Sequence, residues 1–197
     1  MFTGIIENLA EVVEIIPEST NLTFRLRSAL ATELKVDQSV SHNGVCLTVT
    51  NIVADTYSVT AVAETLQKTN LGVWQVGTKV NVERCMTANG RFDGHIVQGH
   101  TDQTGTCTQV QDVDGSWLYD FEYDASLGNL TVEKGSICIN GVSLTVFDST
   151  DSSFRVTIIP YTYEHTNFHQ LQQGHAVNLE FDILGKYIQK ILLKNRL

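Results

Sequence analysis

Stretches that alternate apolar and polar side chains recur along the whole 197-residue chain. Residues 22–26 follow this pattern, and residues 154–159 are predicted to be another strand, which Pro160 ends. A period of two is typical of a half-buried β-strand. Residues 10–16, 45–53 and 56–62 are rich in β-branched side chains, which also favour strands. The pattern therefore predicts many short strands, with residues 45–53 and 56–62 forming a hairpin.

Three segments are predicted to be helical instead. Residues 28–34 are a candidate for a short helix, and residues 64–72 contain no helix breaker and end at Gly72, a suitable C-cap. From Leu184 onward, apolar residues follow the i, i+3, i+4 spacing, with lysines on the opposite side. This spacing predicts an amphipathic terminal helix, which either packs on its own domain or contacts another subunit.

The chain contains an internal repeat. Residues 43–49 read Asn-Gly-Val-Cys-Leu-Thr-Val, and residues 140–146 differ from them only where Ser143 replaces Cys46. The same 97-residue offset relates other short motifs, whereas Gly4 and Gly99 correspond at an offset of 95. Repeats in register indicate two copies of one domain of roughly 90 residues. With about six short strands and one short helix, each copy suits a small closed barrel.

Composition narrows the class of function. The net charge of -9 argues against a nucleic-acid or membrane-surface role, because both rely on clustered lysine and arginine. The chain has no run of about 18 apolar residues and no recognisable signal peptide, so we expect a cytoplasmic protein. Its four cysteines include no C-x-x-C pair, which argues against a zinc site and favours reduced thiols.

Candidate reactive residues lie near the repeated motif. Cys46 and Ser143 put a small nucleophilic or hydrogen-bonding group at the same place in both copies, directly after an Asn-Gly turn. Thr48 and Thr145 lie two residues further on, and therefore on the same face of a strand. His100, which follows Gly99, is a candidate general base.

The remaining histidines, and the absence of several well-known motifs, add less to the prediction of the site. His95 lies close enough in sequence to belong to the same site as His100. His42, His165, His169 and His175 have polar neighbours and are predicted at the surface or at strand edges. No metal-ligand spacing, dinucleotide fingerprint, P-loop or nucleophile elbow is present.

Taken together, these motifs resemble riboflavin synthase of the alpha-chain type. The resemblance rests on residues 1–7, 43–49, 64–66, 69–72, 80–83, 94–100 and 141–146, and it covers nearly the whole chain. It implies an all-β fold of two tandem six-stranded Greek-key barrels, residues 1–87 and 88–184, and a C-terminal oligomerisation helix, residues 185–197.

The resemblance also implies an activity. The family converts two molecules of 6,7-dimethyl-8-ribityllumazine into riboflavin and 5-amino-6-ribitylaminouracil, the last step of riboflavin biosynthesis, without a cofactor or metal. It forms a homotrimer, and each active site lies between the N-barrel of one subunit and the C-barrel of its neighbour. The resemblance leaves open an association with lumazine synthase.

Site residues follow from the resemblance, position by position. Those expected in the N-barrel pocket are Gly4, Ile5, Ile6, Cys46, Leu47, Thr48, Thr60, Ala61, Val62, Ala63, Glu64 and Thr65. Those expected in the C-barrel pocket are Gly99, His100, Thr101, Lys134, Ser143, Leu144, Thr145, Ile159, Pro160, Tyr161, Thr162, Tyr163 and Glu164. The residues expected to take part in catalysis are Ser39, Cys46, His100, Ser143, Thr145 and Asp182.

The chemistry expected is removal of a proton from the acidic C7 methyl group of one lumazine by a base such as His100. The second lumazine is attacked at C7 by water, by a ribityl hydroxyl or by a group such as Cys46. Tyr161 and Tyr163 depart from the family pattern, so the contacts of that stretch are the least constrained. Relatives that bind lumazine or flavin without turnover, as optical antenna proteins, are the alternative.

Overall fold

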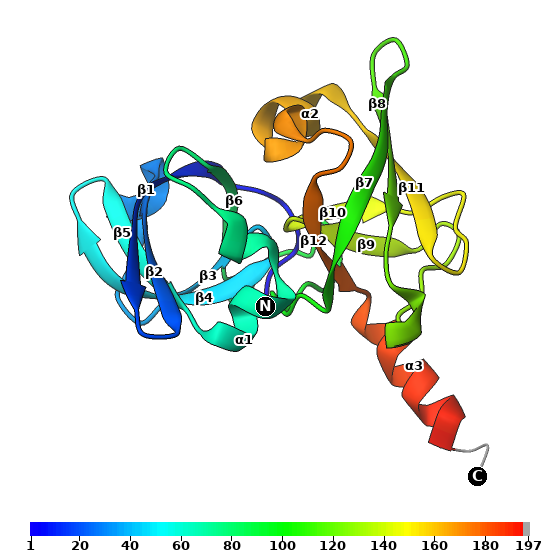
Figure 1. Cartoon of the computed structure of the whole chain (residues 1–197), viewed down its shortest axis with the longest axis horizontal. Coiled ribbons are helices and arrows are strands. Elements are labelled where there is room, and N and C mark those ends of the chain that lie inside the picture. Colours follow the sequence, from blue (N-terminus) through cyan, green and yellow to red (C-terminus); the bar gives the residue numbers. More distant parts are fainter. Residues whose placement is uncertain (195–197) are drawn as a thin grey trace.

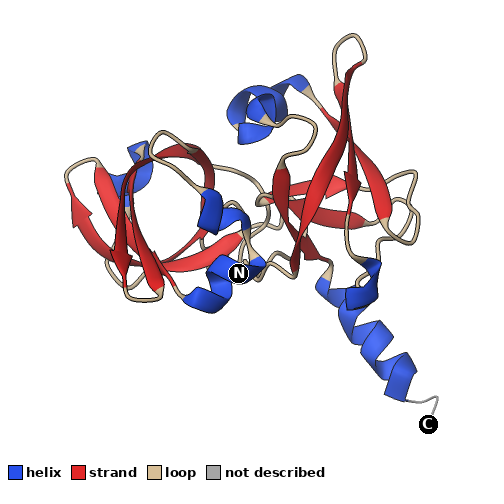
Figure 2. Ribbon diagram, viewed as in Figure 1, coloured by secondary structure: helices blue, strands red, loops and turns tan. Residues whose placement is uncertain are grey.

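The alternating stretches form two six-stranded antiparallel sheets, one from each copy of the repeat (Figures 1 and 2). The structure is a computed structural model and describes residues 1–194. The first sheet closes into a barrel in the order β1-β2-β5-β4-β3-β6. Its strands are β1 (Asn8–Glu18), β2 (Asn21–Arg27), β3 (Ser39–His42), β4 (Val45–Val53), β5 (Thr56–Ala61) and β6 (Lys79–Arg84).

The second sheet has the equivalent order, β10-β9-β12-β7-β8-β11. Its strands are β7 (Gln103–Asp112), β8 (Trp117–Glu122), β9 (Ser136–Ile139), β10 (Val142–Thr145), β11 (Ser153–Ile158) and β12 (Ala176–Phe181). β10 ends at Thr145, and the isolated bridge between Phe147 and Arg155 joins the residues after it to β11. The prediction of two six-stranded barrels is confirmed, with a looser seam in the second.

Each barrel has its own core, built from the inward face of its strands. On β4, Val45, Leu47 and Val49 point inward, while Cys46 and Thr48 lie on the outer face. The predicted Asn-Gly turn before β4 is confirmed, since Asn43 and Gly44 both have positive φ values, +47° and +79°. Positive φ at both central residues is the geometry of a two-residue hairpin turn.

The predicted helices are present, with altered limits. The short helices are η1 (Ala29–Glu33), α1 (Ala63–Lys68), η2 (Asn70–Val73), η3 (Ala125–Leu127), α2 (Pro160–His165) and η4 (Asn167–Gln170). The expected Gly72 cap was wrong because the helix already ends at Thr69, which has extended backbone. The Thr69 hydroxyl accepts a hydrogen bond from the Leu71 backbone N–H, so a separate turn, η2, starts there.

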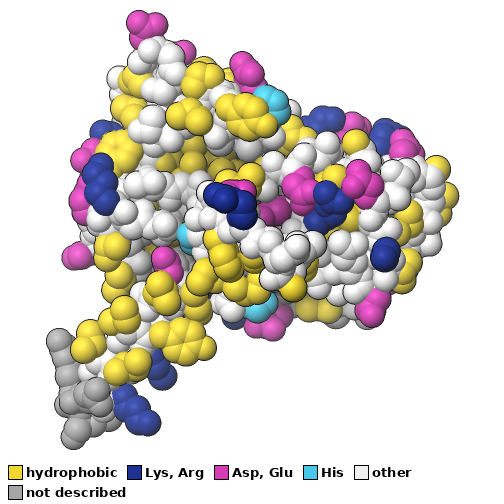
Figure 3. Space-filling model, turned by 180° about the vertical axis from the view of Figure 1, so that it is seen from behind, with side chains coloured by type: hydrophobic (Ala, Val, Ile, Leu, Met, Phe, Trp, Pro, Cys, Tyr) yellow, Lys and Arg dark blue, Asp and Glu magenta, His cyan; other side chains and the backbone are white. Residues whose placement is uncertain are grey.

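The terminal helix α3 (Ile183–Lys194) projects away from both barrels (Figure 1). Two side chains attach it to the second barrel: Lys186 pairs with Asp102 at 2.6 Å, and Gln189 donates to the Gly128 carbonyl at 2.8 Å. Its apolar residues stay exposed, as the space-filling view shows (Figure 3). Residues 195–197, which the predicted terminal helix included, lie outside the described part of the chain. None of the described helices is long and apolar enough to span a membrane.

The surface position predicted for His42 was wrong. Its side chain is 0% exposed and lies in the N-barrel core, where its ring nitrogens contact the Val40 carbonyl at 3.0 Å and the Tyr57 hydroxyl at 2.8 Å. Burial lowers the pKa of His42 to about 4. The corresponding residues of the second barrel are Ile139 and Phe154, so the same place is apolar there.

A network of asparagines joins the barrels along the axis that relates the two repeats. The Asn43 side-chain oxygen accepts from the Asn81 backbone N–H at 2.8 Å and from the Asn167 side chain at 3.0 Å. The repeat-related bonds also form, from Asn178 and Asn70 to the Asn140 side-chain oxygen, at 2.9 and 3.3 Å.

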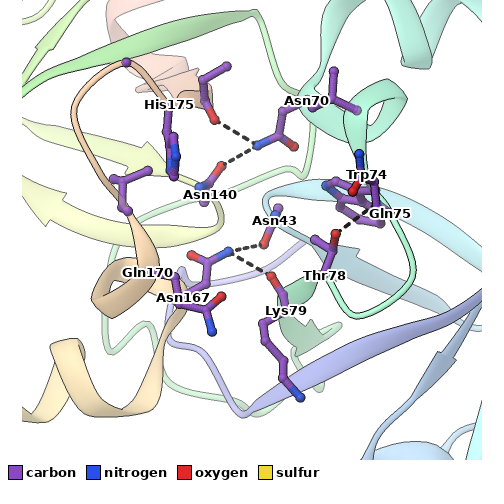
Figure 4. A pocket seen from close by; sticks show the side chains of 14 residues that line it. Asn43, Asn70, Trp74, Gln75, Thr78, Lys79, Asn140, Asn167, Gln170 and His175 are labelled. Atoms are coloured by element: carbon purple, nitrogen blue, oxygen red, sulfur yellow. Dashed lines mark hydrogen bonds between the residues drawn. The ribbon is translucent and has the colours of Figure 1, made fainter.

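This network forms part of the wall of an open groove of about 570 Å³ between the barrels (Figure 4). Because the asparagines bond to one another across the groove, their polar groups are already paired. We therefore interpret the groove as the seam between the barrels.

Candidate functional site

Two segments outside the barrels cross between them. The N-terminal segment, residues 2–6, and the connecting segment, residues 94–101, run antiparallel and pair through Phe2 and Val97, with N–H···O distances of 2.7 and 3.2 Å. Each segment then reaches the barrel formed by the other half of the chain. The connecting segment lines the N-barrel pocket, and the N-terminal segment bonds to Ser143, which lines the C-barrel pocket.

The N-barrel pocket combines residues from both repeats. Its volume is about 360 Å³, and its lining is Val45, Cys46, Glu64, Thr65, Lys68, Thr69, Gly99, His100 and Thr101. The Gly99 carbonyl accepts from the Cys46 backbone N–H at 2.8 Å. A Cβ on Gly99 would lie 2.6 Å from the Cys46 Cβ, so only glycine allows this approach.

The C-barrel pocket lies beside Ser143, and its lining shares two repeat-related positions with the N-barrel pocket, Ser143 for Cys46 and Thr162 for Thr65. Its volume is about 370 Å³, and its lining is Lys134, Ser143, Leu144, Thr145, Phe147, Thr157, Ile159 and Thr162. The Gly4 carbonyl accepts from the Ser143 backbone N–H at 2.8 Å, and a Cβ on Gly4 would lie 2.6 Å from the Ser143 Cβ. Ile6 packs against the core of this second barrel.

These segments lie against the opposite barrels to those expected, and the N-terminal segment lines neither pocket. Gly4 and Ile6 were expected with Cys46 but lie against the C-barrel, and Ile5, which is exposed, stands between them. Gly99, His100 and Thr101 were expected with Ser143 but line the pocket of Cys46. The repeat aligns the segments with their own barrels in sequence, and only the folded chain shows that they cross.

Other expected residues surround the pockets without lining them. Leu47 and Ala61 are buried in the N-barrel core, and Thr60 bonds to Thr23 at 2.7 Å. Thr48 pairs in register with Ser39 on the outer face of the barrel. The remaining residues of this first set, Val62 and Ala63, are the N-cap and first residue of α1.

In the second barrel, the stretch that begins α2 is only partly in contact with the pocket. Tyr163 stacks on Trp117 with ring centroids 3.7 Å apart and so attaches α2 to the sheet. Tyr161 is 69% exposed and stacks on His165. Pro160 and Glu164 are exposed on the same helix. Asp182 caps α3, accepting from the Leu184 N–H at 2.9 Å, and lines a groove beside it.

The pair formed by His95 and Ser143 is a feature that the repeat alone could not show. The His95 Nδ1 atom lies 2.7 Å from the Ser143 Oγ atom. Burial lowers the pKa of His95, against the opposing charge of Asp182, so its imidazole is neutral near pH 7. A neutral imidazole can accept the Ser143 proton and make the hydroxyl oxygen more basic.

Cys46 stands in a different environment from its counterpart. Burial raises the pKa of the Cys46 thiol, and a hydrogen bond with Ser39 only partly opposes this effect. The thiol therefore stays protonated near pH 7, which makes it a poor nucleophile but a usable hydrogen-bonding group. His100 faces the same pocket from the connecting segment.

Comparisons with known proteins agree with this architecture. A family model described as "Lumazine binding domain" matches residues 3–85 and again residues 98–182. Riboflavin synthase of Actinobacillus pleuropneumoniae is 42% identical over 195 residues, which are 98% of this chain and 91% of the relative. Riboflavin synthase of Bacillus subtilis (strain 168) is 37% identical with the same coverage, and the Saccharomyces cerevisiae enzyme is 34% identical over 98% of this chain and 87% of its own.

Solved structures share the fold at lower identity. LumP complexed with riboflavin superposes with a TM-score of 0.85 at 21% identity, over 92% of this chain and all of LumP. LumP complexed with 6,7-dimethyl-8-(1'-D-ribityl) lumazine gives a TM-score of 0.83 at 19% identity, over 91% and 98% of the two chains. These likenesses concern the fold alone. With both lumazine-binding domains matched and full-length relatives above 30% identity, the chain belongs to the riboflavin synthase family.

Proposed function

We infer that this chain catalyses the formation of riboflavin, by transfer of a four-carbon unit between two molecules of 6,7-dimethyl-8-ribityllumazine. The second product is 5-amino-6-ribitylaminouracil. The observation that carries this inference is the near-complete alignment with riboflavin synthases at up to 42% identity. Both pockets keep polar side chains, among them Cys46 and His100 in one and Lys134, Ser143 and Thr145 in the other, and Cys46 and Ser143 occupy corresponding positions.

Two similar pockets suit a reaction between two identical molecules. Each cavity holds about 360 to 370 Å³, and no residue lines both. Within one chain, each pocket therefore binds one lumazine separately. Face-to-face contact of two ring systems then requires the N-barrel pocket of one subunit to meet the C-barrel pocket of another. Fixing the two rings in this orientation supplies much of the acceleration.

The two pockets differ in the groups that can move protons. In the C-barrel, the Ser143 hydroxyl paired with His95 is the strongest candidate for taking a proton from the C7 methyl group. In the N-barrel, Cys46 remains a thiol, so water or a ribityl hydroxyl is the better candidate for attack at C7. Cys46 and His100 then orient the second lumazine, and no metal or cofactor takes part.

We propose that the chain assembles as a homotrimer through α3, and the exposed apolar face of this helix supports the proposal. Leu184, Ile188 and Leu192 line a groove of about 530 Å³ between the helix and residues 130–136. An apolar face of this length is normally covered by another chain. We place the protein in the cytoplasm, where its four free cysteines stay reduced.

The test is to mix the purified protein with 6,7-dimethyl-8-ribityllumazine and to follow riboflavin absorbance. Appearance of riboflavin together with the pyrimidine product supports the enzyme. Fluorescence of bound lumazine with no product would instead indicate a non-catalytic antenna protein. The variant His95→Gln is a control for proton transfer through His95. Its amide can keep a hydrogen bond to Ser143, but the imidazole that accepts the proton is removed.

A further inference from the structure

Two buried carboxylates lie between the barrels and line neither pocket. Glu83 is near the end of β6 and Glu180 near the end of β12, and the 97-residue repeat relates them. Glu83 is 4% exposed and Glu180 is 3% exposed. A carboxylate buried this deeply is tolerated only when strong hydrogen-bond donors surround it. The identity of those donors indicates what the two residues do.

Glu83 binds the N-terminal segment. One carboxylate oxygen accepts from both the backbone N–H and the hydroxyl of Thr3, each at 2.7 Å, and the other accepts from the Gly4 N–H at 2.9 Å. These bonds fix the residue whose carbonyl receives the Ser143 N–H. Glu83 belongs to the N-barrel, yet the segment it fixes is bonded to Ser143, which lines the pocket of the C-barrel.

Glu180 binds the connecting segment in the same manner. Its carboxylate accepts from the backbone N–H groups of Gln98, Gly99 and His100, at 2.6, 2.9 and 2.9 Å. The same segment places Gly99 against Cys46 and brings His100 into the N-barrel pocket. Here too a residue of one barrel fixes a segment that lines the pocket of the other, since Glu180 belongs to the C-barrel and the pocket to the N-barrel.

The strength of these contacts supports a specific role. Hydrogen bonds to an ionised carboxylate are shorter and about twice as strong as neutral ones. Burial raises the pKa of both carboxyl groups, and the backbone N–H donors oppose this by stabilising the charged form. Neither pocket segment belongs to a named strand, and Glu83 and Glu180 bind two and three of their backbone N–H groups.

We propose that Glu83 and Glu180 are positioning residues, each of which sets the geometry of the pocket in the opposite barrel. The inference rests on the proposed function for its catalytic meaning, but its structural content can be tested without turnover. Both residues act through the segments they bind, and neither lines a pocket itself.

The experiment compares Glu180→Gln with Glu83→Gln, two substitutions of matched size and position. In each, an amide N–H₂ group replaces one acceptor oxygen and faces a backbone N–H, so at least one hydrogen bond is lost. The readout is the rate at which iodoacetamide alkylates Cys46, followed by peptide mass spectrometry. Catalytic activity does not enter this measurement, so it remains informative even if no riboflavin forms.

The expected result is an increase of about tenfold in the Cys46 alkylation rate for Glu180→Gln, the factor that corresponds to about 1.4 kcal/mol. Glu83→Gln should leave that rate within about twofold, because its segment lies on Ser143. Equal acceleration in both variants, or no acceleration in either, would overturn the proposal. If riboflavin synthesis is confirmed, both variants should also lose turnover.

A measurement on the unmodified protein covers the case in which a variant does not fold. Amide hydrogen exchange should show residues 98–100 protected as strongly as neighbouring strand residues, despite lying outside any sheet. Rapid exchange at these amides would show that Glu180 does not hold the segment, and would overturn the proposal independently of the variants.

Discussion

The buried pair of His42 and Tyr57 predicts a specific dependence of stability on pH. Burial lowers the pKa of His42 from its ordinary 6.5 to about 4 in the folded protein. Between these values the unfolded chain binds a proton that the folded chain does not, so stability falls as pH falls from 6.5 to 4. At about 1.36 kcal/mol per pKa unit, the loss amounts to about 3 kcal/mol.

The second barrel supplies the control for this prediction. Because Ile139 and Phe154 occupy the corresponding positions, the double variant His42→Ile/Tyr57→Phe copies a packing that the fold already accepts. Replacing both partners of a buried hydrogen bond by apolar groups is nearly neutral, so we expect a change within about 1 kcal/mol at pH 7. His42→Ile alone leaves the Tyr57 hydroxyl unpaired and should cost about 1 to 3 kcal/mol.

The assay is urea unfolding of both proteins at fixed concentration, from pH 7 down to pH 4. Other groups that titrate in this range, including Glu83 and Glu180, are present in both proteins and cancel in the difference. The free energy of unfolding of the unmodified protein should fall by about 3 kcal/mol relative to the double variant. Parallel curves would refute the reasoning, as would an NMR titration that places the His42 pKa near 6.5.

Three further predictions concern single residues. Cys46→Ser should lower turnover while lumazine binding is largely kept, and full turnover with unchanged binding would contradict a role for the thiol. Tyr123→Phe should raise the free energy of unfolding by about 1 kcal/mol, because the buried Tyr123 hydroxyl has no protein partner among the described residues. Tyr119→Phe should lower the free energy of unfolding, because it removes a 2.9 Å hydrogen bond to the Phe168 carbonyl. Ile188→Asp on the apolar face of α3 should reduce the mass measured by light scattering to that of one chain, and the polar-face change Lys190→Asp should leave the proposed trimer intact.

The sequence predicted the repeat, the strand content and the terminal helix because these depend on local pattern. The alternation through Val45, Leu47 and Val49 fixes which side of β4 is buried, and the Asn-Gly pair fixes the turn before it. His42 was predicted at the surface because its neighbours in the sequence are polar, and this was wrong. The alternation with Val40, and Ile139 at the repeat-related position, were the signals that could have corrected it.

The division of the candidate site was harder to predict for a physical reason. Residues 2–6 and 94–101 contain no periodic pattern, and their positions are set by backbone contacts to Glu83, Glu180, Cys46 and Ser143. Such contacts depend on which of the two barrels each segment reaches, and the sequence repeat does not contain this information. The pairing of His95 with Ser143 follows from the same crossing, so it too needed the folded chain.

The crossed segments have a consequence for how the chain comes apart. Separating the barrels removes Gly4 from Ser143, Gly99 from Cys46 and the asparagine bonds between the repeats, so neither half keeps its native surroundings. Two domains joined by a simple linker often unfold in separate steps. Here the two barrels should unfold together as one cooperative unit, so calorimetry should record a single transition. The repeat is the unit of sequence, but it is not the unit of unfolding.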